Sequence, residues 1–114
     1  MAFQASAREV MGVTLIHASG KLTLGAGGTA LRDTLHVLVH KGHKKFLVNM
    51  AGVDFIDSFG IGELVHSYAT VRKQGGELKL VHVTQKVHDL LQITRVHTLF
   101  EIHTDEQTAL GGFR

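Results

Sequence analysis

Asp57 and Ser58 lie where an apolar run gives way to a helical pattern, and their side chains are the best placed in this sequence for chemistry or binding. Phe46 to Val48 has the continuous apolar character of a strand that is buried on both faces. Ser58 is therefore predicted at the N-cap of the following helix, where its oxygen meets free backbone N–H groups. The same N–H groups and the helix dipole favour a phosphate. Ser58 is thus either a plain cap or a hydroxyl that carries a phosphate.

The neighbours of Ser58 have both structural and binding interpretations. Asp57 either orients the hydroxyl or meets a basic group of a partner, or it simply complements the helix dipole. Phe59 is expected to be exposed, because the residues that follow already supply an inward apolar stripe, and an exposed ring would anchor a partner. Gly60 and Gly62 each cost the helix roughly 1 kcal/mol relative to Ala. Their presence indicates that backbone or a partner approaches this turn closely.

Other candidate sites in the sequence are incomplete. His36 and His40 share one helix face, with His43 just beyond, and this spacing can ligate zinc. No carboxylate or Cys completes the set, so we expect no metal. Gly25 to Gly28 lacks the Lys-Ser/Thr ending of a P-loop, which leaves nucleotide binding as a distant alternative. Because no Ser-His-Asp order or Gly-x-Ser-x-Gly motif is present, the sequence predicts a protein that is not an enzyme and has no cofactor.

The composition narrows the classes of protein further. The length of 114 residues fits one domain, 1–114, whose core needs no disulfide, and the chain contains no Cys. The net charge is only +2, and the basic cluster Lys41 to Lys45 reads as a solvated connection without interleaved aromatics, which argues against nucleic-acid binding. No signal peptide and no apolar run near ~20 residues is visible. We therefore expect a soluble, cytoplasmic protein without membrane insertion.

Strand and helix patterns alternate along the chain. We expect strands at 3–10, 13–18, 46–49, 77–82 and 99–102, the second of them stopped by Gly20. Helices are expected after Thr29, from Ser58 to about residue 74, near 85–94, and after Thr104, where Gln107 would complete a capping box. Alternating strands and helices imply parallel pairing, and the opening hairpin adds an antiparallel edge. The prediction is an α/β fold with a mixed, mostly parallel sheet of about five strands and about four helices.

This order of elements, with Asp57-Ser58-Phe59-Gly60 between the third strand and the second helix, resembles the STAS domain. More narrowly, it resembles the bacterial anti-sigma factor antagonists. The likeness covers nearly the whole chain, through the segments Ser19 to Leu22, Phe46 to Asn49, Val53 to Gly62, Gly75 to Leu78 and Gln107 to Leu110. The resemblance implies that Ser58 is a phosphoacceptor. The unphosphorylated antagonist would sequester a kinase-type anti-sigma factor and release a sigma factor, and a serine phosphatase would restore it after phosphorylation.

Two positions depart from the pattern of that family. Phe59 stands where a second Ser is common, and Thr23 stands where an acidic residue is common in the loop before the first helix. In the family this loop lies beside the acceptor, so the expected partner-binding residues are Asp57, Phe59, Gly60, Gly62 and Thr23. The two departures favour an alternative reading. The chain would then be a non-phosphorylated STAS scaffold in a transport or signalling complex, with the turn at Ser58 as a fixed docking surface.

Overall fold

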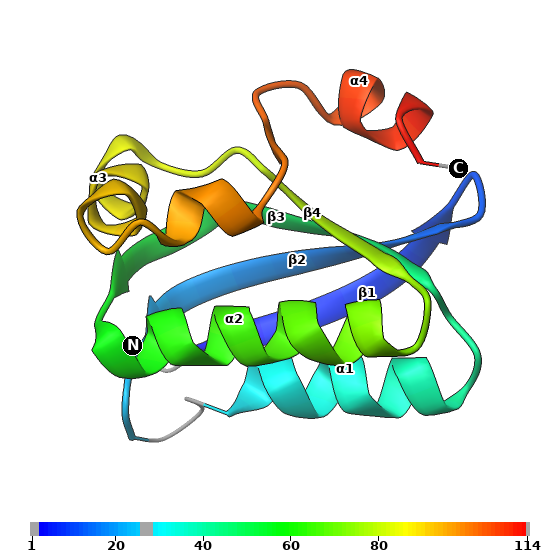
Figure 1. The fold of residues 1–114 in the computed structure, drawn as a ribbon, viewed down its shortest axis with the longest axis horizontal. Coiled ribbons are helices and arrows are strands. Elements are labelled where there is room, and N and C mark those ends of the chain that lie inside the picture. Colours follow the sequence, from blue (N-terminus) through cyan, green and yellow to red (C-terminus); the bar gives the residue numbers. More distant parts are fainter. Residues whose placement is uncertain (1–2, 26–28, 114) are drawn as a thin grey trace.

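The structure is a computed structural model that describes residues 3–25 and 29–113. Within these residues five strands, four α-helices and one 3₁₀-helix follow one another (Figure 1). In chain order they are β1 Gln4–Val10, β2 Val13–Leu22, α1 Ala30–His40, β3 Lys45–Ile56, α2 Ser58–Lys73, β4 Glu77–Val81, α3 Gln85–Ile93, η1 Val96–Leu99, β5 Ile102–His103 and α4 Glu106–Gly111.

The strands form one mixed sheet in the order β1-β2-β3-β4-β5. Only β1 runs antiparallel to its neighbour, and the pairs β2–β3, β3–β4 and β4–β5 are parallel. Met11 and Gly12 connect β1 to β2 with positive φ angles of 54° and 79°. Such a two-residue turn matches the right-handed twist of a hairpin. The predicted α/β fold, with its antiparallel edge strand, is confirmed.

The helices cover the two faces of the sheet unequally. Helices α1, α2 and α3 pack on one face, where Leu35, Leu64 and Leu91 join sheet residues in the larger core cluster. Helix α4 lies on the opposite face (Figure 1), where Ala109 and Leu110 pack in a smaller cluster. None of the helices within the described residues combines the length and apolarity needed to span a lipid bilayer.

Two strands are longer than the sequence predicts. β2 passes through Gly20 instead of stopping there, and β3 runs on to Ile56 through residues that read as a connector. The two strands stay paired as far as Leu22 and Ile56, with register shifts on either side of Ser19 and Gly20. Glycine and bulges absorb such irregularities without ending a strand. Long-range pairing has therefore overridden the local turn signals.

Three further local details differ from the prediction. The expected last strand at 99–102 is instead η1 followed by the two-residue β5, after Arg95 adopts a left-handed φ of 61°. Asp105, rather than Thr104, caps α4 by accepting a hydrogen bond from the Thr108 N–H. Thr29 precedes α1 as expected, but its hydroxyl donates to Asp33 instead of capping the helix. Asp is a stronger capping residue than Thr, which explains the one-residue error at α4.

Candidate functional site

The turn between β3 and α2 is held by Asp57. Its backbone is extended, with φ −113° and ψ −174°, and its Oδ1 accepts a hydrogen bond of 2.9 Å from the Gly60 N–H. Asp57 is therefore the N-cap, and the prediction that Ser58 occupies this position is wrong by one residue. A carboxylate caps as well as a hydroxyl does, and its charge also complements the helix dipole.

The second carboxylate oxygen of Asp57 reaches the loop that follows β2. Oδ2 accepts from the Leu24 N–H at 3.4 Å, and the Asp57 N–H donates to the Leu22 carbonyl at 3.4 Å. Thr23, half-buried, lies between these two contacts. The loop after β2 therefore lies beside the start of α2, as the resemblance implies. The Asp57 side chain bonds to both the loop and the helix.

Ser58 is the first residue of α2 and is exposed. Within the described residues its hydroxyl makes no hydrogen bond, because Asp57 already supplies the cap. The first turn of a helix presents N–H groups without helical partners and the positive end of the dipole. Ser58 thus offers an accessible hydroxyl in surroundings that favour an added negative charge.

The two glycines of this turn differ. A Cβ on Gly60 would collide with the Leu22 carbonyl oxygen and lie 2.7 Å from Ile56 Cγ1, so the backbone of β2 approaches the helix here. A Cβ on Gly62 would meet no other described atom within 4 Å, and Gly62 is exposed. The close approach inferred from the sequence is therefore internal at Gly60, while Gly62 leaves the surface open.

Apolar residues occur on the segments that lead into and contact the start of α2. Phe59 is half-buried rather than exposed as expected. Leu24 and Phe55 are 73% and 38% exposed, and the Lys86 Nζ lies 5.3 Å from the centroid of the Phe55 ring. Leu24, Phe55 and Lys86 are not among the site residues expected from the sequence, and Phe55 lies beyond the expected end of the third strand at residue 49. An apolar residue inside a glycine-rich loop was the signal available for Leu24.

The other sequence candidates lie elsewhere in the molecule. His43 Nδ1 is 2.8 Å from Thr14 Oγ1, so it does not join His36 and His40. Within residues 3–25 and 29–113 no group of three or more His, Cys, Asp or Glu side chains is arranged to hold a metal ion. In the glycine-rich segment Gly25 to Gly28, the residues after Gly25 lie outside the described part of the chain.

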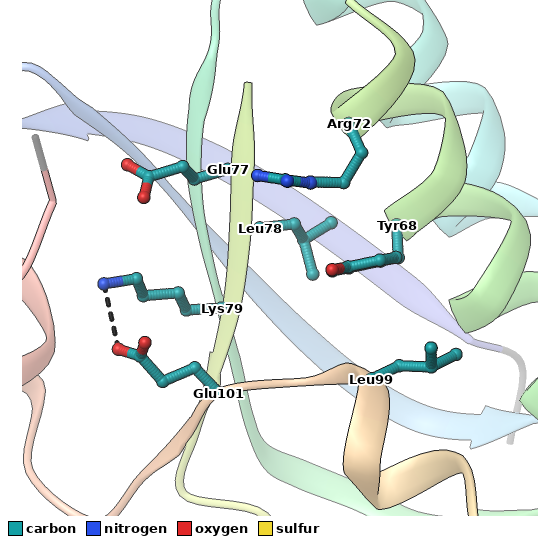
Figure 2. Close-up of a pocket in the computed structure, with 7 residues that line it drawn as sticks. All are labelled: Tyr68, Arg72, Glu77, Leu78, Lys79, Leu99 and Glu101. Carbon is teal, nitrogen blue, oxygen red and sulfur yellow. Dashed lines mark ion pairs between the residues drawn. The ribbon is translucent and has the colours of Figure 1, made fainter. Parts of the chain in front are cut away.

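A hollow of about 180 Å³ lies beside the C-terminal half of α2, away from Ser58 (Figure 2). It is lined by Tyr68, Arg72, Glu77, Leu78, Lys79, Leu99 and Glu101. Lys79 is only 6% exposed, because the C-terminal residues Gly112 and Phe113 lie against it. Its Nζ pairs with Glu101 Oε2 at 2.9 Å and donates to the Gly112 carbonyl at 2.9 Å. None of the residues expected at the Ser58 site lies in this hollow.

The chain belongs to the STAS domain family, whose sequence profile matches residues 4–109. Among its relatives is the anti-sigma F factor antagonist of Paenibacillus polymyxa. The two are 23% identical over 99 residues, which cover 87% of this chain and 85% of the relative.

Solved structures agree with this assignment of the fold. An anti-sigma factor antagonist from Mycobacterium paratuberculosis superposes with a TM-score of 0.85 at 18% identity, covering 99% of this chain and 95% of the other. The Bacillus cell fate determinant SpoIIAA in its phosphorylated form superposes with a TM-score of 0.71 at 17% identity, covering 96% and 97%. At these identities the likeness establishes the shared architecture.

Proposed function

We propose that this chain is an anti-sigma factor antagonist whose binding is switched by phosphorylation of Ser58. In its unphosphorylated form it would sequester a kinase-type anti-sigma factor in the cytoplasm and so release a sigma factor. Membership of the STAS family and the names of its relatives support this role. The proposal describes a protein-binding module rather than an enzyme.

The main support for this proposal is that Asp57, and not Ser58, caps α2. Asp57 accepts the capping hydrogen bond, so within the described residues the exposed Ser58 hydroxyl makes no hydrogen bond that the fold would lose. A phosphate on Ser58 would add about −1.5 to −2 charges without removing a cap. At a helix N-terminus such a charge is stabilising by typically ~0.3–1 kcal/mol. The fold would therefore tolerate the modification.

The switch would act through the surface rather than through refolding. Leu24, whose N–H is bound by Asp57, and Phe55, near the end of β3, are exposed apolar residues, which suits a contact that excludes water. A phosphate in the middle of such a contact would lose its hydration, and each unpaired charge that is desolvated costs several kcal/mol. Binding should therefore fall by orders of magnitude when Ser58 is phosphorylated, and a serine phosphatase would restore it.

The modification itself can be tested with the cognate kinase-type anti-sigma factor. The chain is incubated with this kinase and ATP, and the product is examined by intact-mass and peptide mass spectrometry. We expect one added phosphate on Ser58, none in Ser58→Ala, and unchanged phosphorylation in Ser6→Ala, which alters an exposed serine on β1. Phosphate on another residue, with Ser58 unmodified, would refute the assignment of the acceptor.

The effect on binding needs a separate measurement. Calorimetric titration of the anti-sigma factor should give a dissociation constant at least about tenfold weaker for Ser58→Asp than for Ser58→Ala, since only the former adds charge. Equal affinities for the two variants would remove the charge mechanism. If the wild type also remains unmodified by the kinase, the fixed STAS scaffold suggested by Phe59 and Thr23 becomes the better reading.

A further inference from the structure

Two histidines face each other on the exposed side of α1. The rings of His36 and His40 are stacked, with centroids 5.1 Å apart and planes inclined by 25°. Both residues line a groove of about 330 Å³ between α1 and α2, together with Val39, Thr70 and Gln74. The groove therefore has a mixed polar and apolar lining and is open to solvent beside two imidazoles.

This arrangement has the chemistry of a chelate. Residues four apart on a helix point the same way, so His36 and His40 can direct one ring nitrogen each toward a common point. Neutral imidazole is a good ligand for zinc, nickel and copper ions. Because both rings already lie on one helix face with their centroids 5.1 Å apart, one ion could engage both without a change in the helix backbone.

The facing helix supplies oxygen rather than further nitrogen or carboxylate. Thr70 Oγ1 donates to the His66 carbonyl at 3.0 Å, which leaves its lone pairs available as acceptors. Gln74 is the C-cap of α2 and is among the residues that line the groove. The one carboxylate of α2 that faces α1, Glu63, is already engaged, since its Oε1 lies 3.1 Å from Arg32 Nε.

Although the sequence alone led us to expect no metal here, we propose that His36 and His40 bind a divalent transition-metal ion of the zinc and nickel class, with the amide oxygen of Gln74 as third ligand and water completing the shell. The bound ion would join α1 to the C-terminal end of α2. Ser58 stands at the opposite end of α2, so this site is independent of the proposed switch. Its test neither requires nor affects the anti-sigma factor.

The direct test is calorimetric titration of tag-free protein with ZnCl₂ and, separately, NiCl₂. We expect one ion per chain. Because even the loss of groups that merely support a ligand weakens metal sites about 10–100-fold, His36→Gln and His40→Gln should each lower the affinity at least about tenfold. The matched control is His17→Gln, which removes an exposed histidine from β2 and should leave the affinity unchanged.

A second variant tests the third ligand by gain of affinity. Gln74→Glu replaces the amide with a charged oxygen and should tighten zinc binding, measured by competition with a chromophoric chelator. An unchanged affinity in Gln74→Glu would refute the participation of α2. Binding by the double variant His36→Gln/His40→Gln that equals the wild type, or no binding by the wild type up to about millimolar zinc, would overturn the site itself. Circular dichroism of each variant verifies that it is folded.

Discussion

At the scale of single residues, Asp57 takes the capping role that the sequence suggested for Ser58. Residue types alone predicted a cap and a free polar side chain at this point, but two adjacent residues of equal capping propensity cannot be ordered by type. The choice depends on the extended backbone of Asp57 and on its contact with the Leu24 N–H. That contact joins residues 33 positions apart, so no local pattern contains it.

The cap makes a measurable contribution to stability. Asp57→Ala should lower the free energy of unfolding by about 1 kcal/mol, the typical value of an N-cap, since the Gly60 N–H loses its acceptor. Asp57→Asn keeps an oxygen in place and should lose less. Chemical denaturation measures the difference. Asp54→Ala, at an exposed position on β3, is the control, and an equal loss in that variant would contradict the cap.

At the scale of elements, the sequence predicted the kind and order of the strands and helices better than their ends. The apolar run at Phe46 identified β3, but Gly52 and Asp54 read as a connector because their types disfavour strands. In the folded chain β2 runs alongside that segment to Leu22, and this non-local pairing keeps it extended. The packing of Gly60 against the Leu22 carbonyl depends on the same extension of β2.

Gly60 and Gly62 form a matched pair for testing this packing. Gly60→Ala should destabilise the fold by at least about 1–3 kcal/mol, the usual range for overpacking, because its methyl group meets the Leu22 carbonyl. Gly62→Ala enters open space and should instead stabilise the helix by up to about 1 kcal/mol. Thermal unfolding should show a lower midpoint temperature for Gly60→Ala and a higher one for Gly62→Ala. An unchanged midpoint in Gly60→Ala would contradict the close approach of β2.

At the scale of the whole molecule, the alternation of strands and helices sufficed to predict the mixed sheet and its antiparallel edge. It did not predict that α4 would cover the second face alone. On that face, Lys79 of β4 is enclosed by Glu101, the Gly112 carbonyl and the Phe113 ring, whose centroid is 4.6 Å from Nζ. These contacts attach the C-terminal residues to the sheet.

The ion pair between Lys79 and Glu101 should make the free energy of unfolding depend on pH in the acid range. The hydrogen bond from Lys79, and then that from His103, hold the pKa of Glu101 below its ordinary value. Because the folded pKa is lower than the unfolded one, the contribution of Glu101 is complete above its ordinary pKa of about 4.3. It is lost as the pH falls through the lowered folded value.

We therefore expect the stability difference between the wild type and Glu101→Gln to shrink as the pH is lowered from about 6 to about 3. Denaturant unfolding at several pH values measures it. Added salt should reduce the difference as well, because Glu101 is largely exposed. Glu9→Gln on the exposed side of β1 is the control, and a pH-independent difference for Glu101→Gln would contradict the ion pair.

The double hydrogen bonding of Asp57 has a consequence for mutational mapping of this surface. Replacing it withdraws support from the backbone of Leu24 at the same time as it frays α2. An alanine scan against any binding protein would therefore assign to Asp57 an energy that belongs in part to a displaced leucine. A double-mutant cycle between positions 57 and 24 separates the two contributions.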